Sequence, residues 1–376
     1  MAANAANQRE RMRERPRKGG KPMSKSFVNK ALLGSAVAAG AAVWAIAPRT
    51  FSDKRRNYVP SIPDVWYAHR GLHDAGSGLT AQYANESGEY VALARRMAMK
   101  AGYGSPSVTG AIAPENSLAA FAAACEAGYG IELDLQMTAD GEIVVVHDGD
   151  LMRVAGDPRR IADLTYDELT HIPLFPTDAP GAAVAAPLSG SLEKPPLVTT
   201  PDSAPDGYFQ HVPLFADVLK VVAGRVPLIV EYKFDDNSKW GPRDVELMEK
   251  GDALLQAYSG AYVIESFNPA AVNWYKENRP EVCRGQLSWW PQGEEKPSDP
   301  GALAKEYAAG ALIFDWISRP DFVAYDWHGG NSPQVRLARF MGAVPVSWTV
   351  RSRDELAQCD DWFDHHIFEA FVPDEQ

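Results

Sequence analysis

Two carboxylates stand two residues apart inside an apolar stretch at residues 130–135, Gly-Ile-Glu-Leu-Asp-Leu. A β-strand projects alternate side chains to opposite faces, so Glu132 and Asp134 share one face. Two like charges side by side in a half-buried strand resist desolvation unless a cation or strong hydrogen-bond donors neutralise them. The pair therefore predicts a divalent metal site, and the alternative is a strand-end salt-bridge pair with Arg70 and Lys233.

Further polar side chains stand at the ends of other apolar stretches. His69 and Arg70 end the first stretch, His147 ends the third, and Glu231 and Lys233 end the fourth. In a barrel of parallel strands, the carboxyl ends of the strands meet at one mouth, where active sites are built. We therefore expect three carboxylates, two imidazoles and two cations to meet there, a set suited to phosphate chemistry.

The rest of the chain supplies the framework for such a mouth. Beyond residue 60, short apolar stretches alternate with amphipathic ones, which is typical of an α/β protein with parallel strands. An eight-stranded (β/α)8 barrel, the TIM barrel, is the economical architecture, although the pattern predicts nine strands for eight places. The predicted strands are 65–71, 130–137, 143–148, 226–233, 262–267, 283–288, 311–316, 344–350 and 365–369. The predicted helices are 116–127, 214–223, 244–258, 269–278, 302–309 and 334–341.

Two long segments interrupt this alternation. Residues 74–113 separate the first strand from the next motif, and residues 175–210 are rich in Pro, Ala, Ser and Thr. Loops of this length without regular structure are usually functional covers or disordered excursions. We therefore expect a barrel over residues 65–373 with two insertions, the first of which covers the mouth.

Charge is distributed unevenly along the 376 residues, whose formal net charge is -12. Residues 1–30 carry nine Lys or Arg and two Glu, so the remainder is strongly acidic. An acidic body argues against nucleic acid as a partner. A phosphate substrate would then need local cations, either a metal ion or the side chains of Arg and Lys.

An uncharged stretch, residues 31–47, follows the basic tail and is just long enough to cross a bilayer as a helix. We expect residues 31–48 to be a transmembrane anchor and residues 49–64 a linker. The basic tail should stay in the cytoplasm, which makes the barrel extracytoplasmic. The alternatives are a cleaved signal peptide and a buried soluble helix, although Pro48 argues against cleavage directly after Ala47.

Five ordered motifs resemble those of the glycerophosphodiester phosphodiesterases, relatives of phosphatidylinositol-specific phospholipase C. Weaker matches follow at residues 265–268 and 348–350, and the resemblance extends over residues 65–373. Together the ordered motifs are far more specific than any single one. The five motifs are His69-Arg70-Gly71, Pro114-Glu115-Asn116-Ser117, Glu132-Leu133-Asp134 with Thr138-Ala139-Asp140-Gly141, Val146-His147-Asp148, and Val230-Glu231-Tyr232-Lys233.

The resemblance implies metal-dependent hydrolysis of glycerophosphodiesters to glycerol 3-phosphate and an alcohol. In that family one divalent cation, Mg²⁺ or Ca²⁺, sits on carboxylates that match Glu132, Asp134 and Glu231, and oxygen ligands suit either ion. His69 and His147 match the acid–base pair, and the near-neutral pKa of imidazole suits both tasks. The sequence leaves open which histidine is the base and whether water attacks directly or a cyclic phosphate forms first.

Four further residues are assigned to the substrate or its phosphate. Arg70 and Lys233 are the natural protein cations for phosphoryl oxygens. Glu115 belongs to a motif that, in the family, contacts the metal region or the glycerol hydroxyls, although the same residues also resemble a helix start. Trp348 is expected to contact a glycerol or acyl group of the substrate.

The chain departs from the common family pattern at three places. The segment between His69 and Glu115 is much longer than in typical members, Glu369 stands where many relatives have Asp, and Arg351 stands where Asn is frequent. These departures leave the substrate range open. Besides a small phosphodiester, the candidates are a lysolipid, cleaved by a lysophospholipase D-like activity that a nearby membrane would favour, and a non-catalytic barrel used for binding.

Overall fold

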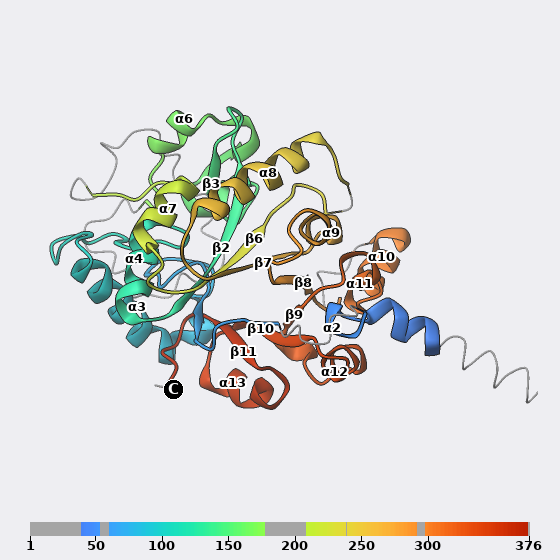
Figure 1. Cartoon of the computed structure of the whole chain (residues 1–376). Helices are drawn as coiled ribbons and strands as arrows, with labels where there is room; N and C mark the ends of the chain where they lie inside the picture. Colours follow the sequence, from blue (N-terminus) through green and yellow to red (C-terminus); the bar gives the residue numbers. More distant parts are fainter. Residues whose placement is uncertain (1–38, 53–59, 177–207, 238, 292–297, 375–376) are drawn as a thin grey trace, which may run out of the picture. The chain divides into compact units, whose positions relative to one another are not determined.

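Eight parallel strands close into a barrel in the computed structural model, which describes residues 39–52, 60–176, 208–237, 239–291 and 298–374 (Figure 1). Strand β1 pairs with both β2 and β11, which closes the sheet. The predicted TIM barrel is therefore confirmed. The barrel strands are β1 (Tyr67–Ala68), β2 (Gly130–Met137), β6 (Leu228–Tyr232), β7 (Tyr262–Ser266), β8 (Arg284–Ser288), β9 (Phe322–Asp326), β10 (Val344–Val350) and β11 (His365–Phe368).

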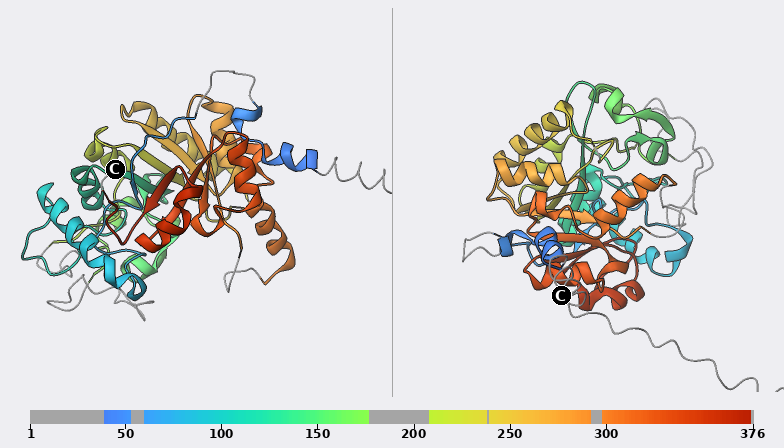
Figure 2. Two further views of the ribbon diagram at one scale, coloured as in Figure 1. Left: turned by 90° about the horizontal axis from the view of Figure 1, so that it is seen from below. Right: turned by 90° about the vertical axis from the view of Figure 1, so that its right-hand side faces the viewer.

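The helices around the barrel follow the predicted pattern, and Figure 2 shows them from two further sides. All six predicted helices are confirmed to within two residues at each end. Polar caps explain several starts, because the Ser117, Asn268 and Asp299 side chains each accept a hydrogen bond from a backbone N–H of the first turn. The helices are α4 (Leu118–Ala127), α7 (Phe215–Val222), α8 (Pro242–Ala257), α9 (Pro269–Asn278), α10 (Pro300–Gly310), α12 (Pro333–Phe340) and α13 (Arg353–Cys359).

The strand predicted at residues 311–316 is wrong. That stretch forms a turn and the short helix α11 (Asp315–Ser318), and the barrel strand in its place is β9. A short apolar run does not distinguish strand from helix by itself. Here burial decides, because Ile313 and Trp316 are 45% and 44% exposed whereas the first four residues of β9 are fully buried.

The strand predicted at residues 143–148 exists in part but lies outside the barrel. Strand β3 (Ile143–Val145) pairs antiparallel with the outer part of β2. The chain therefore reaches the mouth along β2, turns, and comes back along β3. This return, rather than the end of a barrel strand, brings His147 to the mouth.

The first insertion is folded rather than a loop. It contains η1 (Ala81–Tyr83) and the helix α3 (Ala84–Lys100), which packs against α4. The buried carboxylate of Asp74 ties its two ends together by accepting hydrogen bonds from the backbone N–H groups of Ile112 and Ala113. Most of the second predicted insertion lies outside the described residues.

Short elements complete the described chain. They are α2 (Arg49–Ser52), β4 (Asp150–Leu151), α5 (Met152–Ala155), β5 (Asp157–Arg160), η2 (Ile161–Asp163), α6 (Tyr166–Thr170), η6 (Trp327–Gly329) and η7 (Asp360–Trp362). Of the predicted anchor, residues 31–38 lie outside the described residues, and residues 39–46 are helical. Within the described ranges, no helix combines the length and apolar character needed to cross a bilayer. The barrel belongs to a compact unit of residues 45–376.

Candidate active site

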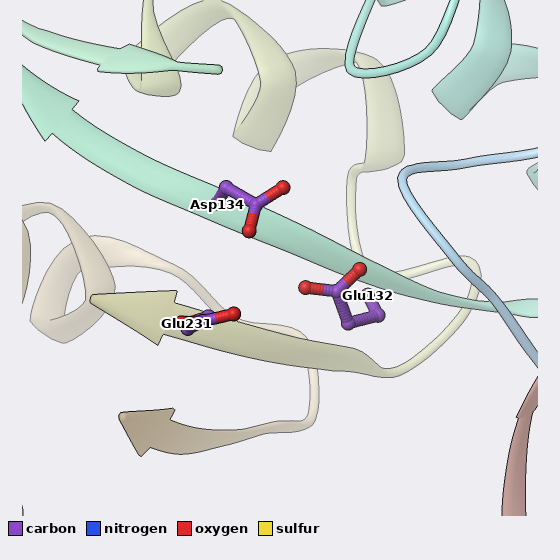
Figure 3. Close-up of side chains that lie close together, drawn as sticks. All are labelled: Glu132, Asp134 and Glu231. Carbon is purple, nitrogen blue, oxygen red and sulfur yellow. The ribbon is translucent and has the colours of Figure 1, made fainter. Parts of the chain in front are cut away.

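Three buried carboxylates meet at the mouth of the barrel. Strand β2 carries Glu132 and Asp134, and the neighbouring strand β6 carries Glu231, which is in register with Asp134 (Figure 3). One oxygen of each lies within 4.8 Å of the others, and none of the three residues is more than 5% exposed. The predicted triad is therefore assembled, and its all-oxygen donor set fits a hard divalent cation.

Burial and mutual repulsion make two of these carboxylates hard to ionise. Burial, together with the charges of Asp134, Glu231 and Glu265, holds the pKa of Glu132 well above its usual range. Burial also raises the pKa of Glu231 to about 7, against the opposing effect of Lys233. A bound cation would remove both penalties, which is the electrostatic reason to place one here.

Asp134 behaves differently because its partners outweigh its burial. Burial would raise its pKa, but Lys233, His147, Arg70 and a hydrogen bond from Asn116 together lower it. The Nδ2 group of Asn116 donates to Asp134 Oδ2 at 2.8 Å. Asp134 is therefore an anion in the absence of any metal ion.

Arg70 follows β1 in a left-handed conformation, with φ of 56°, that turns its backbone and side chain toward the carboxylates. Its backbone N–H donates to Glu132 Oε2 at 3.1 Å, and its Nη1 group donates to Glu115 Oε1 at 2.8 Å. Its Nε atom lies 3.6 Å from Asp134 Oδ2. The predicted phosphate-binding guanidinium is thus at the site, but it is already paired with acids.

Lys233 follows β6 directly and faces the same group. Its Nζ atom lies 2.7 Å from Glu231 Oε2 and 3.2 Å from Asp134 Oδ1. These two carboxylates outweigh the effect of burial and raise the pKa of Lys233 to about 12. The ammonium is therefore a fixed cation beside the proposed metal ligands.

His69 is held by Glu369, the buried acid at which the chain departs from the common family pattern. Its Nδ1 atom lies 2.8 Å from Glu369 Oε2, and its Nε2 atom lies 3.9 Å from Glu132 Oε2. Burial lowers the pKa of His69 to about 4, with Arg70 acting in the same direction and Glu369 against it. The imidazole is therefore neutral near pH 7 and presents Nε2 toward the carboxylates.

His147 reaches the site through the β2–β3 hairpin. The backbone N–H of Val146 donates to Asp134 O at 2.9 Å, which holds the end of the hairpin against β2. His147 Nδ1 lies 2.6 Å from Asp148 Oδ1, and burial lowers the pKa of His147. The structure thus gives both predicted histidines a carboxylate at Nδ1.

The carboxylate of Glu115 accepts more hydrogen bonds from the protein than the sequence led us to expect. Besides Arg70, it accepts a bidentate pair of hydrogen bonds from Arg153, at 2.6 and 2.9 Å, and one from the backbone N–H of Ser77 at 2.7 Å. Ser117 caps α4. In this arrangement Glu115 positions two arginines, and its contact with substrate stays a prediction.

Trp348 lies on β10 with its ring edge-on to Phe267, at a centroid distance of 5.5 Å. Lys233 Nζ lies 5.8 Å from the centroid of the same Phe267 ring. The indole Nε1 is buried and has no hydrogen-bond partner among the described residues. Trp348 is therefore near the site, as predicted, with its contact to substrate untested.

Sequence reasoning missed two residues of this network. Arg153, on α5, joins Glu115 to Asp148 through its Nε–H, which donates to Asp148 Oδ2 at 2.6 Å. Asn116 belongs to the matched motif at residues 114–117 but was given no role in the site, where its side chain donates to Asp134. The position of Asp148 directly after His147 was a signal that Asp148 contacts this histidine. No motif around Arg153 indicated its role in the site.

Comparison with known proteins identifies the family of this chain. Residues 108–368, more than half of the chain, match the model of the glycerophosphoryl diester phosphodiesterase family. A glycerophosphodiester phosphodiesterase from Caldanaerobacter subterraneus is 46% identical over 60 residues, which are 16% of this chain and 25% of that protein. Bovine glycerophosphodiester phosphodiesterase 1 is 45% identical over 61 residues, 16% of this chain and 18% of that protein. The chain thus aligns with a quarter or less of these curated relatives.

Two solved structures share the fold. A phosphodiesterase from Oleispira antarctica, in complex with the product sn-glycerol-3-phosphate, superposes with a TM-score of 0.52 and 17% identity, covering 82% of this chain and 94% of that one. A Silicibacter pomeroyi protein named for the same family superposes with a TM-score of 0.51 and 24% identity, covering 73% and 94%. On the strength of the family match, this chain belongs to the glycerophosphoryl diester phosphodiesterase family.

Proposed function

We propose that the protein hydrolyses glycerophosphodiesters to glycerol 3-phosphate and an alcohol with the help of one divalent cation, Mg²⁺ or Ca²⁺. The observation that carries the proposal is the carboxylate triad of Glu132, Asp134 and Glu231 together with two imidazoles, His69 and His147, that are each held by a carboxylate. Family membership and the glycerol 3-phosphate bound to the Oleispira structure support the same substrate class.

The two histidines supply the proton transfers. Each has Nδ1 held by a carboxylate, Glu369 for His69 and Asp148 for His147, so each offers Nε2 to the reacting oxygens. One imidazole takes the proton of the attacking hydroxyl or water, and the other gives a proton to the departing alkoxide. Both imidazoles have a carboxylate partner at Nδ1, so either histidine can be the base and the other the acid.

The fixed cations of the site bind the phosphoryl oxygens. Arg70 and Lys233 lie beside the triad and are held in place by Glu115 and Glu231. A metal ion bound to the triad would stabilise the additional negative charge of the transition state. Because the site is buried, these charges act in a medium of lower dielectric than water and are correspondingly stronger.

We also propose that residues 31–48 anchor the protein in a membrane and that the barrel is extracytoplasmic. The support is the uncharged stretch at residues 31–47 and the basic tail before it. At this location the protein could meet either of two candidate substrates, a small phosphodiester or a lysolipid.

The first test of the activity uses the full chain in detergent, treated with a chelator and then supplied with Mg²⁺ or Ca²⁺. Glycerophosphocholine is the substrate and glycerol 3-phosphate release is the readout. Release that depends on the added ion supports the proposal. Absence of glycerol 3-phosphate release from glycerophosphocholine and of choline release from lysophosphatidylcholine, with either ion, would leave a binding function.

Variants then separate chemistry from folding. His69→Ala should abolish turnover with little effect on the free energy of unfolding, and Asp134→Ala should also abolish metal binding. Asp315→Asn is the matched control, because Asp315 is a buried carboxyl without a hydrogen-bond partner in the described structure and lies on α11, away from the triad. Wild-type turnover in His69→Ala would refute the assignment.

A further inference from the structure

The turn at residues 75–78, at the start of the first insertion, lies directly on two buried carboxylates of the site. The backbone N–H of Ser77 donates to Glu115 Oε2 at 2.7 Å, and Ser77 Oγ donates to Glu369 Oε2 at 3.4 Å. The Nη1 group of Arg70 donates to the same hydroxyl at 3.2 Å. A serine hydroxyl has one donor and two acceptor positions, so Oγ can accept from a guanidinium while it donates to a carboxylate. Ser77 therefore contacts three charged groups of the site, two acids and one arginine.

The two acids support different histidines. Glu369 holds Nδ1 of His69 at 2.8 Å. Glu115 leads to the other histidine through an arginine and a further acid. Ser77 thus stands where the supports of the two imidazoles meet. The continuous chain of contacts runs through His69, Glu369, Ser77, Glu115, Arg153, Asp148 and His147.

Backbone contacts and close packing fix the turn in place. The backbone N–H of Glu115 donates to Ala75 O at 2.8 Å. A Cβ atom at Gly76 would lie 2.9 Å from Glu115 Oε2, and a Cβ atom at Gly78 would overlap the carboxyl carbon of Glu369. The turn can approach both acids this closely because a glycine stands on each side of Ser77. The position of Ser77 between the acids is therefore set by the backbone around it.

We propose that Ser77 is a positioning residue that couples the two histidines. The inference rests on the proposed function, in which both imidazoles act on one phosphate and must keep their Nε2 atoms directed at it. A displacement of about 1 Å in an active site can reduce the rate about 100-fold, so a residue that fastens both supports has a direct effect on turnover. The first insertion, which is much longer than the same segment of typical relatives, then supplies part of the framework that holds the histidines.

Steady-state kinetics of the full chain, with glycerophosphocholine and a saturating concentration of Mg²⁺ or Ca²⁺, separate positioning from substrate binding. Ser77→Ala removes the hydroxyl but keeps the backbone contact to Glu115, so it should lower kcat about tenfold with KM nearly unchanged. Ser77→Thr keeps the hydroxyl and should restore kcat to within about twofold of the wild type. Ser105→Ala is the matched control, because Ser105 lies in the same insertion and its hydroxyl shares a hydrogen bond with that of Ser107. Wild-type kcat in Ser77→Ala, or a loss that Ser77→Thr does not restore, would overturn the inference.

A spectroscopic test of the coupling needs no turnover. Proton–nitrogen correlation spectra of the full chain, labelled with nitrogen-15 in its histidines, report the imidazole signals of His147, which are assigned with His147→Gln. Glu369→Gln should shift these signals in the wild-type background but not when Ser77→Ala is also present, because the chain of contacts is then interrupted. Equal shifts in the two backgrounds would overturn the coupling. If the wild type releases no glycerol 3-phosphate while the shifts follow this expectation, the proposed function is refuted and the coupling stands.

Discussion

Arg351 Nε donates to Glu369 Oε1 at 2.5 Å, and the other oxygen of Glu369 accepts from His69 Nδ1 at 2.8 Å. Arg351 and Glu369 are the two strand-end residues at which the chain departs from the common family pattern. The structure shows that the two departures contact each other. Glu369 is fully buried, and burial would raise its pKa, but Arg351 and His69 lower the pKa well below the usual range.

The first prediction concerns this pair. Arg351→Asn leaves a buried carboxylate without its strongest partner, and Glu369→Asp withdraws the carboxylate from His69, so each should lower kcat/KM by about tenfold or more. The double variant, with the residues frequent in relatives, should lose less than the two single effects combined. Residues in contact commonly show coupling of about 0.5–3 kcal/mol. Measurement of kcat/KM for all four proteins checks this, and strictly additive losses would show that the pair is not coupled.

The second prediction concerns the pH dependence of metal binding. The pKa of Glu231 is raised to about 7, so this carboxyl binds a proton in the metal-free protein below neutral pH, and burial and neighbouring carboxylates also hold the pKa of Glu132 well above its usual range. Protons and metal ions compete for these oxygens, so Mg²⁺ affinity should fall as pH decreases through 7, by about tenfold per pH unit for each proton displaced. Calorimetric titrations one unit below and one unit above pH 7, in buffers of different ionisation enthalpy, measure both affinity and proton release. Asp315→Asn should show the same pH dependence as the wild type, and a pH-independent affinity would contradict the proposed ligands.

The third prediction concerns the turn after His69 and Arg70. Gly71 has φ of 81°, and a Cβ atom there would lie 2.9 Å from the backbone carbon of Ala120. Gly71→Ala should therefore reduce the free energy of unfolding by about 2–4 kcal/mol. This loss exceeds the cost of the left-handed backbone conformation for alanine, because the steric contact with Ala120 adds to it. Gly128 is the matched control, since it has φ of 83° but nothing within 4 Å of its Cβ position, and Gly128→Ala should cost about 1 kcal/mol. Denaturant titration compares the two, and equal losses would argue against the steric contact.

The fourth prediction concerns the residues behind His147. Asp148→Asn removes the negative charge that holds Nδ1 of His147, and we expect kcat to fall about 100-fold with little change in KM. Arg153→Lys cannot keep both the bidentate contact to Glu115 and the contact to Asp148, so it should lower stability by about 1–3 kcal/mol and, because Asp148 then holds His147 less firmly, should also lower kcat.

A matched pair of substitutions checks this explanation. Arg159 makes a comparable set of hydrogen bonds to Asp157 away from the triad. Arg159→Lys should therefore affect the free energy of unfolding but leave kcat unchanged. If Arg153→Lys and Arg159→Lys had the same effect on kcat, Arg153 would have no role in positioning His147.

The sequence by itself determined the composition of the site. Alternation in a strand placed Glu132 and Asp134 on one face, and the polar ends of the apolar stretches identified His69, Arg70 and Glu231. These inferences worked because they depend on local geometry, namely the two-residue repeat of a strand and the shared direction of parallel strands. The helices were predicted for the same reason, because caps and periodicity are local.

Only the tertiary structure decided which groups contact one another. The choice of β9 over residues 311–316 depended on burial, which is a property of the whole fold. Arg351 and Glu369 pair although 18 residues separate them, and Arg153 links Asp148, five residues before it, to Glu115, 38 residues before it. Such contacts leave no periodic signal in a single sequence, because side-chain pairing across a barrel mouth is set by the closure of the sheet rather than by spacing along the chain.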